Sequence, residues 1–179
     1  MRYNVSQLLK EHTGPSRHHQ LHEDISDLDP TLKPLTALNG NVELIRTPDG
    51  ILVRADLHTS VELTCSRCLT QFSMPVRFKV DEEFLPTVDI MTGARLPETE
   101  DTDPATLIDI HHLLDLTEIV RQDLNLALPY VPLCRNECKG LCPNCGQNWN
   151  DGDCDCTEQA LDPRFAVLQQ LLDDKESLN

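Results

Sequence analysis

Apolar and polar residues alternate through the middle of the chain, and this alternation predicts β-strands. In residues 53–65 the odd-numbered positions are mainly apolar and the even-numbered positions are polar. In residues 72–80 the even-numbered positions are the apolar ones. A period of two is typical of strands with one buried face, so we expect two long half-buried strands. A shorter strand over residues 41–46 precedes them.

Two turns connect these expected strands. In Thr47-Pro48-Asp49-Gly50 the proline fixes φ, the aspartate can bond nearby backbone and the glycine supplies a positive φ. Cys65-Ser66-Arg67-Cys68 separates the two long strands and is therefore expected at or near the tip of a hairpin. Pro75 falls on the polar side of its strand and has no N–H to donate, which indicates a sheet edge or a bulge.

Helical spacing appears twice in the second half of the chain. Asp115-Leu116-Thr117-Glu118 has the form of a capping box, and Pro129 ends the apolar run that follows. A second, short helix is expected from Pro163 onward. Both apolar stripes are interpreted as core: the first comprises Leu116, Ile119, Val120, Leu124 and Leu128, and the second Phe165, Leu168, Leu171 and Leu172.

Length and patterning predict one domain with small additions. The 179 residues divide into an N-terminal arm (1–40), a β-sheet domain (41–133) and a zinc-binding module with the terminal helix (134–179). Gly14, Pro15, Pro30 and Pro34 interrupt any helix in the arm, which is expected to be irregular and partly extended. We expect a mostly β (α+β) protein with a long-stranded, antiparallel, curved sheet, one packed helix and a C-terminal cysteine-rich zinc module.

Charge narrows the possible classes of partner. The formal net charge is −15, and protonation of all seven histidines would still leave it negative. This excludes binding to nucleic acid by whole-molecule attraction to phosphate, although a local basic face stays possible. Eleven acids and one base fall in residues 81–118, whose first half is expected to be a mobile acidic loop.

The expected compartment is the cytoplasm, with no membrane partner. No apolar run approaches the roughly 20 residues that span a bilayer. The first ten residues lack the apolar core of a secretory signal. In a reducing compartment, cysteines in pairs are more typical of metal ligands than of disulfides.

Eight cysteines fall in four pairs: Cys65/Cys68, Cys134/Cys138, Cys142/Cys145 and Cys154/Cys156. Residues 134–156 contain almost no large apolar side chains besides Leu141 and Trp149, so burial alone cannot order them. A bound metal can. Zinc takes four N or S ligands in a tetrahedron, and these pairs supply thiolates for two such sites.

Spacing along the chain predicts how the thiolates are shared. Cys142-Pro143-Asn144-Cys145-Gly146 has the form of a zinc knuckle, and Gly146 permits the positive φ that points backbone N–H groups at the sulfurs. Cys154 and Cys156 can close that site. The other four cysteines, Cys65, Cys68, Cys134 and Cys138, would form a second one. Arg67, Arg135 and Lys139 lie beside them in the sequence and would offset their negative charge.

Three other interpretations of the cysteines stay open at this point. One is a single zinc with spare thiols, and another is an iron–sulfur cluster, although the common ferredoxin spacings differ. The third is a dithiol redox enzyme built on Cys65/Cys68, which lacks a βαβ context. No zinc-hydrolase motif, phosphate-binding glycine loop or nucleophile elbow is present. All-thiolate sites are closed and structural, so we expect no enzymatic activity and no small-molecule substrate.

Several strings together resemble the YceD family of large ribosomal RNA subunit accumulation proteins. They are Leu63-Thr64-Cys65-Ser66-Arg67-Cys68-Leu69, Leu128-Pro129 with Pro132-Leu133-Cys134, Cys138-Lys139-Gly140-Leu141-Cys142-Pro143-Asn144-Cys145-Gly146, and Asp162-Pro163-Arg164. The likeness extends from Asn4 to Leu172 and includes Gly40 and the Arg46-Thr47 to Gly50 turn. It implies a non-enzymatic factor in ribosome biogenesis that supports synthesis, processing or stability of 23S rRNA, and so assembly of the large subunit.

The resemblance fixes no residue that contacts RNA, but the strand pattern offers a surface. Arg54, Arg77 and Lys79 lie on the polar side of the two long strands, and Arg67 lies at their tip. These cations could bind rRNA or a precursor large-subunit particle. Equally, the face could be a solvated one balanced by Asp56 and Glu62. A second hypothesis is an adaptor whose acidic loop, residues 86–104, engages basic ribosomal proteins.

Overall fold

The computed structural model describes residues 1–97 and 103–156 of the chain. These residues form two compact units. The first contains Met1–Ser66 and Thr70–Cys134, and the second contains Arg67–Leu69 and the chain from Arg135 onward. The helix expected from Pro163 lies outside the described residues.

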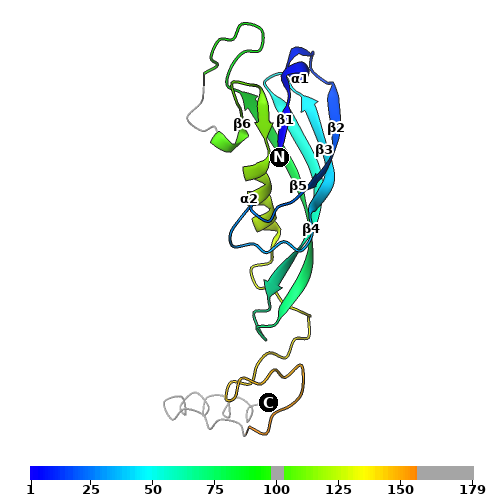
Figure 1. Ribbon diagram of the computed structural model, residues 1–179, viewed down its shortest axis with the longest axis vertical. Coiled ribbons are helices and arrows are strands. Elements are labelled where there is room, and N and C mark those ends of the chain that lie inside the picture. The colour runs from blue at the N-terminus through cyan, green and yellow to red at the C-terminus, as the bar shows by residue number, and fades with distance from the viewer. Residues whose placement is uncertain (98–102, 157–179) are drawn as a thin grey trace, which may run out of the picture. The chain divides into compact units, whose positions relative to one another are not determined.

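A five-stranded sheet in the order β2-β3-β4-β5-β6 forms the body of the first unit (Figure 1). Its strands are β2 (Ser16–Glu23), β3 (Leu38–Arg46), β4 (Ile51–Thr64), β5 (Gln71–Pro86) and β6 (Leu107–Ile108). All neighbours are antiparallel except β5 and β6. A separate two-stranded ladder joins β1 (Arg2–Asn4) to β7 (Leu113–Asp115). The expectation of a mostly β protein is confirmed.

The two long strands predicted by alternation are β4 and β5. They pair from Ile51↔Phe84 to Thr64↔Gln71, so Cys65 to Cys68 lie at the hairpin tip as expected. Odd-numbered residues of β4 and even-numbered residues of β5 are mostly buried, while the alternate residues form an exposed surface, here called the open face. Among the described residues, β5 pairs on its other side only with β6, at Leu85 and Pro86, so Pro75 lies on an edge of the described sheet.

Gly50 is required in the β3–β4 turn for a different reason from the one expected. Gly50 does not have the positive φ that was expected of it. A Cβ at this position would lie 2.1 Å from the carbonyl oxygen of Phe84, so only glycine permits this approach. The turn itself is closed by Thr47, whose N–H donates to the Gly50 carbonyl and whose hydroxyl accepts from the Gly50 N–H.

Residues 1–40 are more regular than an irregular arm. A short helix, α1 (Ser6–Lys10), follows β1, and β2 pairs with β3 over its whole length. Only Leu21 of β2 is buried. The sequence of this edge strand therefore shows no alternation of apolar and polar residues that would have predicted it. Val5, Leu8 and Leu9 join the core.

A layer of short elements covers the buried face of the sheet. The main helix, α2 (Thr117–Ala127), packs on β5 (Figure 1) through buried Ile119, Val120 and Leu124. Each such side chain contributes about 1.5–3 kcal/mol by burial. The expected capping box is not formed. The side chain of Asp115 accepts a hydrogen bond from the N–H of Thr117, and the side chain of Glu118 accepts from the side chains of Arg121 and Gln122.

The acidic segment contains more structure than a loop. Asp81, Glu82 and Glu83 belong to β5, whose strand continues to Pro86. A hairpin turn then follows with a bridge between Val88 and Arg95. A 3₁₀ turn, η1 (Pro104–Thr106), leads into β6, with the side chain of Asp103 capping it. None of the helices in the described part of the chain has the length and apolar character needed to cross a membrane.

Candidate metal centre

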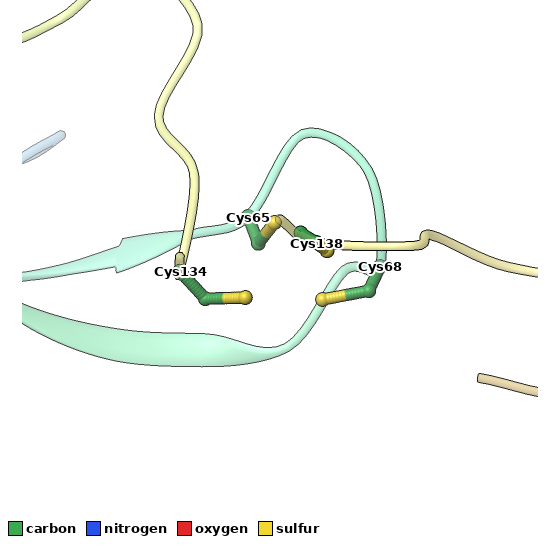
Figure 2. Close-up of side chains that lie close together, drawn as sticks. All are labelled: Cys65, Cys68, Cys134 and Cys138. Atoms are coloured by element: carbon green, nitrogen blue, oxygen red, sulfur yellow. The ribbon is translucent and has the colours of Figure 1, made fainter. Parts of the chain in front are cut away.

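The eight cysteines all lie within the described residues, and none is in a disulfide. They gather in two sets of four, and within each set the sulfur atoms lie within 4.8 Å of one another. The first set is Cys65, Cys68, Cys134 and Cys138 (Figure 2). The second set is Cys142, Cys145, Cys154 and Cys156. The structure therefore groups the cysteines as the spacing predicted.

Tight turns aim the sulfur atoms of the first set at one another. Figure 2 shows Cys68 and Cys134 pointing toward each other, with the sulfurs of Cys65 and Cys138 beside them. The N–H of Cys65 donates to the carbonyl of Thr70 across the hairpin tip, at 2.9 Å. Leu69, the residue after Cys68, has a φ of 59°. This left-handed conformation is rare for leucine, and the same position of the second knuckle is filled by Gly146 with a φ of 74°.

Asn150 organises the polar surroundings of Cys138, a role that the sequence did not reveal. Its Nδ2 donates to the sulfur of Cys138 at 3.3 Å, and its Oδ1 accepts from the backbone N–H of Lys139 and from Nε of Arg135. Arg67 donates from Nη1 to the carbonyl of Cys138 at 3.0 Å. Arg67, Arg135 and Lys139 thus do lie around these thiols, but they act through backbone and amide groups.

The second set is built on the expected knuckle. Cys142 and Gln147 close the turn by a backbone hydrogen bond of 2.8 Å, and the N–H of Gly146 donates to the carbonyl of Cys142. The side chain of Gln147 donates to the carbonyls of Gly152 and Asp153 and so holds the segment that leads to Cys154. The indole N–H of Trp149 donates to the sulfur of Cys154 at 3.4 Å.

The charge state of the second set favours a cation at its centre. Hydrogen bonds from the backbone N–H groups of Cys145 and Asn144 lower the pKa of Cys142 to about 6. In the same set, the hydrogen bond with Cys145 and then burial raise the pKa of Cys156 to about 12. Four thiols at this separation cannot all ionise on their own. A dication would remove that conflict, because a coordinated thiol is deprotonated outright.

Both sets fit a tetrahedral metal. A zinc–sulfur distance of ~2.3 Å places the sulfurs of a tetrahedron ~3.8 Å apart, which lies inside the observed 4.8 Å limit. The sets differ in exposure: Cys65, Cys68 and Cys138 are buried in the first, whereas only Cys142 is buried in the second. Cys145 and Cys156 are exposed. Either set can hold a metal ion, and the second is the more open of the two.

The cations expected to contact RNA are partly paired with acids. Arg54, Arg77 and Lys79 do share the open face, opposite Asp81, His58 and Asp56 respectively. The Nε of Arg54 lies 3.6 Å from a carboxylate oxygen of Asp81. Arg67 lies in the second unit, where it bonds Cys138. That these residues contact RNA stays a prediction.

Comparison with known proteins identifies the family. The sequence profile described as "Large ribosomal RNA subunit accumulation protein YceD" matches residues 53–172, two thirds of the chain. The match covers β4 from Val53 onward, all of β5 and α2, and both cysteine sets. The protein belongs to the YceD family.

Curated relatives agree with this assignment. An uncharacterized protein of Mycobacterium tuberculosis is 31% identical over 124 residues, which is 69% of this chain and 56% of that protein. The uncharacterized protein YlbN of Bacillus subtilis is 30% identical over 168 residues, covering 86% of this chain and 92% of YlbN. A chloroplastic homolog from Arabidopsis thaliana is 25% identical over 76% of this chain and 49% of its own length. The chain thus spans about half the length of the mycobacterial and plant relatives. No solved structure matches it significantly.

Proposed function

We propose that this protein is a non-enzymatic factor that supports synthesis, processing or stability of 23S rRNA, and thereby assembly of the large ribosomal subunit. Membership of the YceD family is the observation that carries the proposal. The Arabidopsis relative is named a large ribosomal RNA subunit accumulation protein. The thiols gather in two sets of four, an arrangement typical of structural metal sites.

Two zinc ions are the metals we propose for the cysteine sets, and their role is structural. Four sulfur ligands from one chain leave zinc no open position for a substrate or an activated water. The proposal therefore needs the metal ions only for folding. Metal analysis of reduced, freshly purified protein is expected to give two zinc ions per chain, and a cobalt-substituted sample should show thiolate-to-metal charge-transfer bands.

The test of function is depletion of the protein from its host cell. We expect lower 23S rRNA and a smaller large-subunit peak when ribosomal particles are separated by sedimentation. Restoring the wild-type chain should reverse both effects. Normal 23S rRNA and an unchanged large-subunit peak after depletion would overturn the proposal.

RNA contact on the open face can be tested separately. Arg77→Gln combined with Lys79→Gln removes the two cations of that face that make no ion pair with described residues. If they touch phosphate, affinity for 23S rRNA fragments falls and the slope of log affinity against log salt decreases by about 1.5–2. Lys10→Gln with Arg95→Gln is the control, since both are exposed cations outside β4 and β5.

One observation favours a second candidate function, an adaptor for basic ribosomal proteins. Each cation of the open face stands opposite an acid or a histidine, and the molecule carries a charge of −15. Such a surface attracts basic proteins more readily than phosphate. If the cation pair Arg77 and Lys79 proves irrelevant while deletion of residues 86–104 abolishes function, the adaptor is the better description.

A further inference from the structure

The first unit contains a cavity of about 280 Å³ at one end of its sheet. One wall is the β3–β4 turn at residues 47–50, and the other is the segment that follows β5. The lining presents both polar and apolar surface, and its apolar residues are Leu9, Pro48, Pro86, Val88, Ile90 and Leu96. A hollow of this size accommodates one large side chain.

Acids dominate the polar part of the lining. Asp49 is exposed at the rim and makes no ion pair with any residue that the structure describes. Asp89 uses one carboxylate oxygen to accept from Met91 and Thr92, and those hydrogen bonds lower its pKa, so it stays ionised. The third polar residue, Arg46, donates from Nη1 to the carbonyls of Thr47 and Gly50. The lining therefore carries a net negative charge.

The wall of the cavity after β5 is a hairpin turn whose backbone is closed by hydrogen bonds but whose apolar side chains stay exposed. Its backbone is closed by the hydrogen bonds Asp89 N–H to Ala94, Gly93 N–H to Asp89 and Leu96 N–H to Thr87, of 2.8, 2.8 and 3.0 Å. Nevertheless Met91 is 79% exposed. Leu96 is 36% exposed beside the cavity. The turn that forms this wall therefore presents two exposed apolar side chains, of which Leu96 lines the cavity.

The surrounding charges decide what kind of partner fits. Glu82 and Glu83 are exposed on β5 next to the turn, and Glu83 accepts from the Thr47 hydroxyl. Nucleic acid would be repelled by this concentration of carboxylates, whereas a basic polypeptide would be attracted. We propose that the cavity is the docking site for an extended basic segment of a partner protein, which inserts an apolar side chain and places a lysine or arginine beside Asp49 and Asp89.

This site deepens the second candidate function, the adaptor, on which it rests, by naming the docking surface, and it does not depend on whether the chain also contacts rRNA. The test starts from the metal-loaded full chain and a phage-displayed library of random dodecapeptides. We expect selection to enrich peptides that combine lysine or arginine with a large apolar residue. The enriched peptide, made synthetically, should shift amide resonances at residues 47–50 and 86–96 in a ¹H–¹⁵N spectrum.

Two variants and a matched control decide the outcome. Asp49→Asn should weaken peptide binding about three- to fivefold, the effect of one partly exposed charge pair. Leu96→Ser should weaken it further, while Asp56→Asn on the open face, an equal loss of charge, should leave affinity unchanged. No enrichment, enrichment of peptides without basic residues, or equal losses for Asp49→Asn and Asp56→Asn would overturn the proposal. So would a single-stranded RNA dodecamer that shifts the same resonances with similar affinity.

Discussion

Gly40 in β3 illustrates how a single residue is constrained by the sheet. A Cβ at this position would lie 2.1 Å from the carbonyl oxygen of Asp56 and 2.8 Å from Cδ2 of Leu57 on β4. Backbone must therefore move to admit alanine. We predict that Gly40→Ala lowers the free energy of unfolding by about 1–3 kcal/mol. The neighbouring exposed substitution Asn41→Ala should change it by less than about 0.5 kcal/mol in the same urea titration. Equal effects of the two would contradict the prediction.

Asp29 fastens the connection between β2 and β3 to the main helix. One of its oxygens accepts from the hydroxyl and N–H of Thr31, and the other accepts from Arg121 and Asn125, each at 3.2 Å. These hydrogen bonds, first those from Thr31, lower the pKa of Asp29 to about 2, although burial acts in the opposite direction. Because this pKa lies below the unfolded value of 3.8, the ionised group stabilises the fold above that value.

The stabilisation by Asp29 should disappear in acid. Asp29→Asn is expected to be less stable than the wild type at pH 7, and the gap between their urea midpoints should close as the pH falls from about 5 to about 2. Asp27→Asn, an exposed carboxylate two residues away, should show no gap at any pH. A gap for Asp29→Asn that persists unchanged at pH 2 would contradict the prediction.

Residue identity predicted the two cysteine sets better than it predicted their surroundings. Cysteine spacing carries its chemistry in the sequence, so both sets could be assigned before the fold was known. Asn150 could not be found in this way, because its contact with Cys138 depends on a turn eleven residues long that brings an ordinary amide back to a thiol. Gly50 was recognised as necessary, but its reason, the approach of Phe84, is a tertiary one.

At the scale of elements, predictability followed burial. Strands β4 and β5 bury one face, and their alternation revealed both strands and the hairpin between them. Strand β2 buries only Leu21, so nothing in its pattern distinguished it from a polar arm. Strand β5 also continues through Asp81, Glu82 and Glu83, because strand pairing with β4 supports acids that local composition assigned to a loop.

The two knuckles should differ in reactivity because they differ in exposure. With metal bound, we predict that iodoacetamide alkylates exposed Cys145 and Cys156 well before buried Cys65 and Cys138. Time-resolved mass spectrometry of digested protein measures the order. Trp149, the only tryptophan, donates to the sulfur of Cys154, so its fluorescence should change in step with loss of the second metal site. Equal alkylation rates across the two sets would contradict this prediction.

At the scale of the whole molecule, the two units are stabilised by different forces. In its described residues the first unit has a continuous apolar core of 24 buried residues, contributed by the sheet, α1, α2 and the connections between them. In the described part of the second unit, Leu69 is 64% exposed and the buried side chains are cysteines. Hydrophobic burial can therefore maintain the first unit alone, whereas the second depends on whatever joins its sulfur atoms.

Removing the metal should consequently unfold the second unit and leave the core of the first unit folded. After chelation under reducing conditions, we predict that amide resonances of residues 135–156 collapse to disordered positions, because no apolar core there offsets the chain entropy. Resonances of β3 and the central part of β4 should keep their dispersion, and readdition of zinc should restore the rest. Loss of dispersion throughout the chain, or an ordered second unit in metal-free protein, would show that sulfur–metal bonds are not what folds it.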